Sequence, residues 1–319
     1  MSRANHLSDD ITDFSSDFSG LRKVINSEMS EGTYVGLRQS LKPRFVLVWV
    51  DLGLTHLLFI GSLYGAAVGK SWIQAPGWAL AIGLTLHRLS LFLHEAAHFN
   101  VGRSKRANDL LTDVLISPFV LTSIGAYRPG HMLHHRHLGT ASDPERSYQH
   151  PLNPKFLISG LVGLRVIEVV RSRESGNASL RSLRGVAVPA IGVVIYAGLF
   201  ALGLIRSNWQ YSLALVAGVI SIFPLVGSLR QLLEHRADRD HFLSPSGSTV
   251  TRSFPTAPLG WLLGAAGFNR HLAHHWDPGI SYTRLRQLER HLVNTSAESI
   301  LEARRNGYLV TFLSLWTSR

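Results

Sequence analysis

The sequence contains no cysteine among its 319 residues, and this absence narrows the chemistry that the chain can support. Without cysteine there is no disulfide framework, no thiolate zinc site, no iron–sulfur ligation and no cysteine nucleophile. Any bound metal must therefore be held by nitrogen or oxygen atoms. Histidine, the natural nitrogen ligand, is abundant, with 16 residues.

Charged residues are also scarce, since they make up 17% of the chain against 45% for hydrophobic residues. This balance is more apolar than that of an ordinary soluble domain, so a membrane protein is expected. The net charge is nevertheless +11, which is typical of proteins that bind nucleic acid or an anionic membrane surface. The distribution of the basic residues decides between the two.

Four apolar segments come close to the length of about 20 residues that a helix needs to cross a bilayer. They fall into two pairs, each joined by a short connection, at residues 45–69, 77–93, 185–205 and 211–229. The sequence therefore predicts two helical hairpins in a membrane.

The first 44 residues lack the apolar core and cleavage site of a signal peptide and are predicted to form a polar cytosolic tail, followed by a membrane domain at 45–319. Four spans then place both long polar regions on the side of the tail. Most lysines and arginines lie there, whereas the two hairpin turns hold only Lys70 and Arg206. This is the positive-inside pattern, so the charge indicates orientation and contact with membrane lipids, and no nucleic-acid partner is expected.

Three histidine motifs lie on the predicted cytosolic side: HEAAH at 94–98, HMLHH at 131–135 and HLAHH at 271–275. Histidines four residues apart share one face of a helix, with Cβ atoms about 6 Å apart, and can bind one ion. A further histidine, His235, follows the fourth span. The candidate metal ligands are His94, His98, His131, His134, His135, His235, His271, His274 and His275. Nine imidazoles exceed what one ion and a substrate can share, so two metal ions are predicted.

A single histidine pair is more often a surface or capping feature than a pair of ligands, but the repeated HxxHH favours metal binding. The other histidines are expected to be structural or surface residues: His6, His56, His87, His137, His150, His241 and His291.

These features together resemble the membrane fatty-acid desaturase and hydroxylase family. The resemblance extends from residue 45 to residue 290 and includes HLAHHWDPGISYTRL at 271–285, where a proline follows the last histidine pair by three residues. It implies an all-α integral membrane protein with four transmembrane helices in two hairpins. A cytosolic helical cap would hold the histidine cage around two non-haem irons, with the eight motif histidines and His235 as ligands. Some relatives place an amide one turn before the ninth histidine, and here that position is Gln231.

The resemblance implies oxygen-dependent desaturation of an acyl-type or other lipophilic chain. Hydroxylation or ketolation of a lipid, carotenoid or small metabolite is an alternative, because the sequence does not show how substrate carbons are placed. The reaction needs two electrons, and the sequence offers neither cysteines for an iron–sulfur cluster nor a nucleotide-binding loop. A separate donor of the ferredoxin or cytochrome type is therefore expected. The arginines expected to attract it are Arg128, Arg136, Arg236, Arg239 and Arg270.

Carboxylates near the motifs are expected to hydrogen-bond to ligand rings and orient them. The candidates are Glu95, Asp143, Glu145, Glu234 and Asp277. HEAAH also matches the zinc-protease motif H-E-x-x-H with Glu95 as general base, but an intramembrane zinc protease leaves the other histidines unexplained. A haem or metal carrier would be expected to place its histidines within facing spans. A metal assay would distinguish the three classes: two non-haem irons indicate a desaturase or hydroxylase, one zinc indicates a protease, and a haem indicates a carrier.

Overall fold

The computed structural model describes residues 33–317 except 141, 146, 166, 168–181, 237–250, 257, 265, 266, 294 and 296. The described residues form helices and no β-strand, apart from an isolated bridge between Ser253 and Arg305. The predicted all-α class is confirmed. The chain divides into two compact units. The hairpin unit comprises Phe45–Met132 and Pro154–Ser228, and the terminal unit comprises the described parts of Met1–Arg44, Leu133–Asn153 and Leu229–Arg319.

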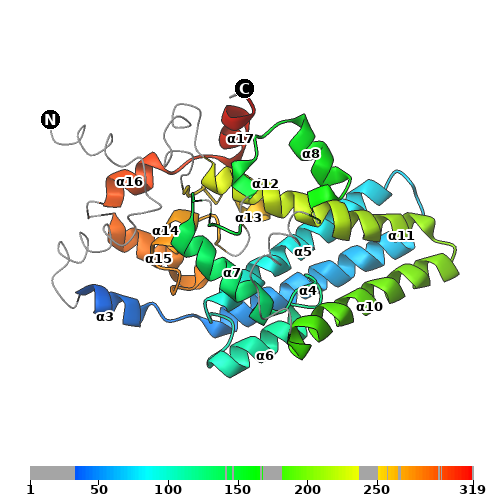
Figure 1. Ribbon diagram of the computed structural model, residues 1–319, viewed down its shortest axis with the longest axis horizontal. Helices are drawn as coiled ribbons and strands as arrows, with labels where there is room; N and C mark the ends of the chain where they lie inside the picture. Colours follow the sequence, from blue (N-terminus) through cyan, green and yellow to red (C-terminus); the bar gives the residue numbers. More distant parts are fainter. Residues whose placement is uncertain are drawn as a thin grey trace. The chain divides into compact units, whose positions relative to one another are not determined.

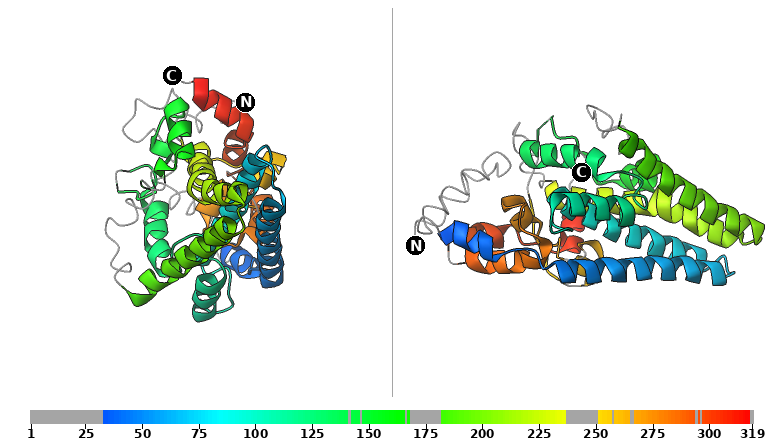
Figure 2. Two further views of the ribbon diagram at one scale, coloured as in Figure 1. Left: turned by 90° about the vertical axis from the view of Figure 1, so that its right-hand side faces the viewer. Right: turned by 90° about the horizontal axis from the view of Figure 1, so that it is seen from below.

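The hairpin unit contains both predicted helical hairpins (Figures 1 and 2). Its long helices are α4 (Phe45–Val68), α5 (Ala75–Ala97), α10 (Leu183–Ile205) and α11 (Trp209–Val216), the last continued by a π-helical segment, η3 (Ala217–Ile222), and by α12 (Phe223–His235). Helices α4 and α5 pack against each other, as do α10 and α11, and α11 and η3 pack on α5. The two hairpins therefore form one bundle around α5.

Close helix packing around α5 depends on two glycines. A Cβ atom on Gly83 of α5 would lie 2.4 Å from the Ile222 side chain, and one on Gly218 of η3 would lie 2.6 Å from the Ile82 side chain. An isoleucine side chain of the other helix thus packs directly against the backbone at each glycine. Small residues at helix contacts allow this approach in membrane proteins.

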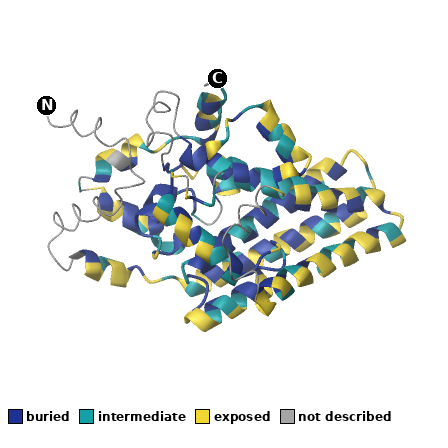
Figure 3. Ribbon diagram, viewed as in Figure 1, coloured by how far each residue is buried: buried dark blue, intermediate teal, exposed yellow. Residues whose placement is uncertain are grey.

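Three of the described helices are long and apolar enough to cross a membrane: Phe45–Val68, Leu183–Ile205 and Trp209–His235. Helix α5 does not reach the same level of hydropathy, because it contains Arg88 and ends in the first histidine motif. Most of its second half is buried, whereas α4 and α10 expose apolar side chains along their length (Figure 3). A fourth span along α5, and with it the cytosolic location of the motifs, stays a prediction.

One asparagine connects the two hairpin turns, which therefore lie at the same end of the bundle. Asn208 caps α11 by accepting a hydrogen bond from the backbone N–H of Tyr211 at 3.0 Å. Its side-chain amide also donates to the carbonyl of Ala67, near the end of α4, at 2.8 Å. The first histidine motif lies at the opposite end of α5, as the predicted topology requires.

Two further helices lie wholly in the hairpin unit, α6 (Lys105–Leu115) and α8 (Pro154–Leu161). The start of the next helix, α7 (Ile124–His137), is fixed by the buried Asp113 of α6, which accepts a hydrogen bond from the backbone N–H of Ile124 at 2.8 Å. Asp113 also pairs with Arg184 of α10. Helices α7 and α12 begin in the hairpin unit and end in the terminal unit.

The terminal unit is built from short helices. They are α3 (Thr33–Ser40), η1 (Ser147–Gln149), α13 (Pro258–Leu263), α14 (His271–Trp276), α15 (Tyr282–Leu292), α16 (Ala297–Ala303) and α17 (Tyr308–Thr317). Its core contains Phe268, Trp276 and Leu288. Of the predicted N-terminal tail, residues 1–32 lie outside the described residues, and the following stretch forms α3.

Candidate metal centre

The first histidine motif lies at the end of α5, where His94 and His98 are one helical turn apart and their ring centroids are 5.3 Å apart. The helix ends there because Phe99 adopts a positive φ of 63°. Arg128 of α7 packs over the Phe99 ring, 4.0 Å from its centroid, and donates hydrogen bonds to the carbonyls of Ala96 and Ala97. A cation at the exposed carbonyls of a helix end is stabilising.

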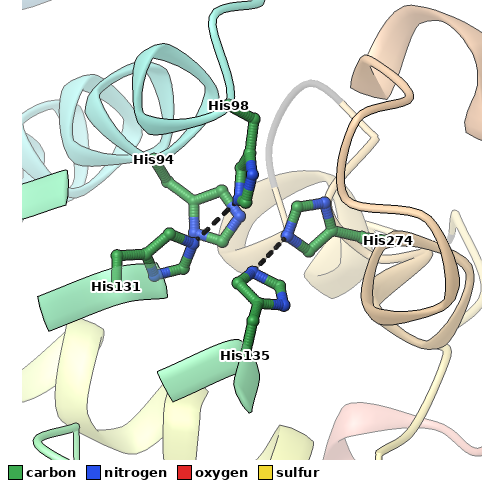
Figure 4. Close-up of side chains that lie close together, drawn as sticks. All are labelled: His94, His98, His131, His135 and His274. Atoms are coloured by element: carbon green, nitrogen blue, oxygen red, sulfur yellow. Dashed lines mark hydrogen bonds between the residues drawn. The ribbon is translucent and has the colours of Figure 1, made fainter. Parts of the chain in front are cut away.

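This contact places His131 of α7 beside the first motif. The Nε2 atoms of His98 and His131 are 2.9 Å apart (Figure 4), and the ring centroids of His94 and His131 are 4.2 Å apart. One ring nitrogen from each of the three histidines lies within 4.8 Å of the other two. Tyr127 stacks on the His131 ring, with 5.2 Å between the two ring centroids. The hairpin unit thus contains a cluster of three imidazoles.

Six further candidate histidines lie in the terminal unit, at the end of α7, at the end of α12 and along α14. The Nε2 of His271 lies 2.8 Å from that of His235 and 3.1 Å from that of His275. The Nε2 atoms of His135 and His274 are 3.2 Å apart (Figure 4). His134 also belongs to the cluster, since its ligand atom lies within 4.8 Å of those of His235 and His275.

The spacing of these nitrogen atoms fits metal binding. Ligand atoms about 2.1 Å from one ion lie roughly 3.0 to 3.4 Å apart in octahedral or tetrahedral geometry. The Nε2–Nε2 distances within each unit are 2.8–3.2 Å, close to that range. Seven of the nine candidates therefore have a ring nitrogen at the spacing of metal ligands, and the other two, His94 and His134, have a ring nitrogen within 4.8 Å of those of their neighbours.

Burial keeps two histidines of the terminal unit, His271 and His275, in the neutral form. It lowers the pKa of His271 and His275 well below the ordinary histidine value, and neighbouring imidazoles lower both further. Both rings are therefore neutral at pH 7. A neutral imidazole has a nitrogen lone pair available for a metal ion.

His134 is the exception, because a carboxylate faces its second ring nitrogen. Its Nδ1 lies 3.0 Å from Oδ2 of the fully buried Asp143, which also accepts hydrogen bonds from the Tyr148 hydroxyl and the backbone N–H of Glu145. Burial lowers the pKa of His134, but the hydrogen bond to Asp143 and the nearby carboxylates outweigh this effect and raise it. The arrangement fixes the ring with Nε2 directed away from Asp143, as in many metal-binding histidines.

A second buried carboxylate, Glu234, lies next to His235. Its Oε1 pairs with Nε of Arg230 at 2.8 Å and accepts a hydrogen bond from the Tyr308 hydroxyl at 3.3 Å. Its Oε2 lies 3.5 Å from Nε2 of His271. Glu234, His235 and His271 form a set that could hold a metal ion, so an oxygen ligand is available beside the nitrogens.

One of the expected roles near the motifs is wrong. Asp277 accepts hydrogen bonds from Tyr34 and Arg38 of α3, at 2.8 and 2.9 Å, and so binds the N-terminal helix instead of a ligand ring. Gln231 donates to Glu145 and accepts from the backbone N–H of Ser147, so its amide holds the loop after α7. Glu95, the remaining carboxylate candidate, is fully buried in α5.

Among the described residues, only some of the arginines expected to attract an electron donor are free of partners within the protein or exposed at its surface. Arg128 and Arg236 point inward and donate to backbone carbonyls, so they brace the protein instead of facing a partner. Arg270 forms an ion pair, Arg136 is exposed, and Arg239 lies outside the described residues. Arg128 and Arg236 are not available to a partner because backbone carbonyls at a helix end and in a loop already accept hydrogen bonds from their guanidinium groups.

Several residues around the histidines were not predicted. Tyr148, Tyr308 and Tyr34 each donate to a carboxylate near the clusters, and no sequence spacing links them to it. Only Arg230 carried a signal, since it precedes Glu234 by one helical turn, the spacing of an ion pair on a helix.

Comparison with known proteins agrees with this arrangement. The fatty acid desaturase family model matches residues 70–305, which include all three motifs, His235 and the second hairpin. The chain belongs to the fatty acid desaturase family. No curated protein matches it significantly. Membership of the family indicates an oxidoreductase of the desaturase or hydroxylase type, and it removes the support for a zinc protease based on HEAAH alone.

Proposed function

We propose that the protein is an oxygen-dependent membrane desaturase that forms a double bond in an acyl-type or other lipophilic chain. The observation that carries the proposal is the clustering of imidazole nitrogens in both units at 2.8–3.2 Å, in a chain of the desaturase family. Hydroxylases and ketolases share this type of centre, and no feature of the described residues favours them.

The proposed cofactor is a pair of non-haem irons, as the use of iron in the family suggests. The donor set supports this, since it is dominated by neutral imidazoles in a chain without cysteine. The proposed ligands are His94, His98, His131, His134, His135, His235, His271, His274 and His275. Bound iron would supply the oxidising power that, with O2 and two electrons, removes hydrogen from an unactivated C–H bond.

The protein's own residues would orient the ligands and keep water out. Asp143 fixes the ring of His134, and Arg128 fixes the end of α5 against α7, so the imidazoles are in position before substrate arrives. Burial of His131, His134 and His271 keeps bulk water from the ligand nitrogens. The exposed apolar side chains of α4 and α10 are suited to lipid, through which a lipophilic substrate would reach the protein.

The two electrons are proposed to come from a separate protein of the ferredoxin or cytochrome type. The reaction then balances: the substrate loses two hydrogens, O2 is reduced to two waters, and the donor supplies two electrons with two protons from solvent. We also propose that the metal centre faces the cytosol, as the distribution of lysine and arginine suggests.

The proposal is tested by expression in a host without a competing desaturase, followed by mass spectrometry of lipids and metabolites. Desaturation gives a product lighter than its substrate by two hydrogens. A product heavier by one oxygen atom identifies a hydroxylase, and absence of any product in the presence of a working donor contradicts an oxygen-dependent function. His134→Ala serves as the inactive control, and His291→Ala, an exposed histidine outside the clusters, as the matched active control.

A further inference from the structure

A pocket in the terminal unit has no histidine in its lining, and the charged residues that line it are four arginines and one glutamate. It has a volume of about 360 Å³, which lies in the usual range for ligand sites. Arg286 and Arg290 reach it from α15, Arg270 from the residue before α14, and Arg305 from the segment before α17. We call this cavity the arginine pocket.

The charges in the lining of the arginine pocket do not balance, because four arginines face one glutamate. Glu289 pairs with Arg270 at 3.0 Å, which uses the one carboxylate in the lining. Arg286 and Arg290 lie one turn apart on α15, where like charges repel, and neither forms an ion pair with any described residue. Several guanidinium groups from different elements therefore meet without enough negative charge. Guanidinium groups bind phosphate oxygens in pairs, so a phosphate-bearing anion suits this site.

The rim of the arginine pocket leads directly into two short helices with exposed apolar side chains. Backbone hydrogen bonds join Ser253 to Arg304 and Asn306, and the Phe254 ring stacks on Tyr308, the first residue of α17, with centroids 3.7 Å apart. Helix α13 begins two residues after Thr256 of the rim, and α13 contacts α17. The exposed apolar residues of the two helices are Leu259, Trp261, Leu262, Leu309, Val310 and Leu313.

This combination is typical of a surface that lies on a bilayer. Short apolar helices at an interface bury their side chains about 5–10 Å deep, at the boundary of headgroups and acyl chains. The lipid phosphates then lie at the level of basic residues beside those helices. We infer that the arginine pocket binds the phosphate of an anionic phospholipid headgroup while α13 and α17 insert their apolar side chains into the same leaflet. This contact would attach the terminal unit to the membrane, and it is independent of the proposed reaction.

The test uses the full-length purified protein in detergent and measures the phosphatidylglycerol or phosphatidylcholine retained per chain by mass spectrometry. The wild type should retain phosphatidylglycerol in preference to phosphatidylcholine. Arg286→Gln with Arg290→Gln should reduce retention roughly tenfold or more, because each basic residue adds to the attraction of an anionic lipid. The matched control is Arg106→Gln with Lys155→Gln, which removes the same charge from exposed positions of the hairpin unit and should change retention little. Equal retention by the two double variants overturns the inference.

A second pair of measurements separates a lipid from a soluble phosphate. Leu309→Ser with Val310→Ser should weaken phosphatidylglycerol retention and leave the arginines in place. Inorganic phosphate that displaces the lipid at millimolar concentration, together with unchanged retention in this apolar variant, would indicate a soluble phosphate ligand and overturn the lipid assignment. Loss of reduction by an acidic donor protein in the arginine variant, with lipid retention intact, would assign the pocket to that donor instead. Thermal unfolding and iron content at the wild-type level show that each variant is folded.

Discussion

Nδ1 of His134 lies 3.0 Å from Oδ2 of Asp143, and both side chains are almost completely buried. The Tyr148 hydroxyl donates to the same carboxylate oxygen, so the carboxylate is itself held in place. A buried carboxylate in this position orients a histidine and raises the basicity of its other nitrogen. The pair therefore links a loop after α7 to the proposed metal centre.

Asp143→Asn is expected to lower iron affinity or product formation about 10- to 100-fold, because the amide keeps the size of the side chain but removes its charge. Iron per chain and product yield measure the effect. Tyr148→Phe, which leaves the carboxylate, should have a smaller effect in the same direction. Full iron content and activity in Asp143→Asn would show that His134 needs no orientation.

His235 tests the assignment of a ligand outside the three motifs. His235→Ala should abolish product and lower iron occupancy, since the Nε2 of His235 lies 2.8 Å from that of His271. His291→Ala, an exposed residue on α15, is the control and should leave both nearly unchanged. Normal iron content and turnover in His235→Ala would reduce the proposed ligands to the three motifs alone.

The contact between α3 and Asp277 should contribute to stability. Tyr34→Phe removes a buried hydrogen bond to a charged group, which is worth about 1.5–3 kcal/mol, while Arg38 keeps its ion pair. The apparent Tm should fall by a few degrees. Tyr64→Phe is the matched control, because that tyrosine is 70% exposed on α4. An unchanged Tm in Tyr34→Phe would indicate that α3 is not held by this contact.

The proposed topology predicts that only the two hairpin turns face outward. Cysteines introduced at Ser71 and Ser207 should react with an impermeant thiol reagent in intact cells, and a cysteine at Ser142 should react only after lysis. The assay is clean because the chain has no native cysteine. Labelling at Ser142 in intact cells would reverse the orientation.

The sequence predicted the helical hairpins and the histidine clusters well, because both depend on local spacing. Apolar runs of span length and histidines at i, i+3 and i+4 constrain their own segments. The sequence did not predict that Asp277 would bind Tyr34 of α3, or that Gln231 would hold the loop at Ser147. Such partners come from distant segments, and hydropathy and spacing carry no information about them.

Contacts with distant segments also explain why α5 contains an arginine and why Arg128 is not at the surface. Helix α5 has the length of a span, but its position at the centre of the bundle allows Arg88, whose Nε donates to Thr55 of α4 at 2.9 Å. Arg128 was expected at the surface, and it instead binds the carbonyls at the end of α5. In both cases tertiary packing provides the partner that makes a charged side chain acceptable.

Iron stoichiometry of the purified protein is the most direct test of the central claim. The account predicts close to two irons per chain and no haem, with zinc as a substitute on overexpression, because imidazole sites accept both metals. A variant lacking His131, His134 and His135 should lose most of this metal, since these residues belong to the clusters of both units. One metal per chain at saturation, retained in the triple variant, would contradict a histidine-bound pair of irons.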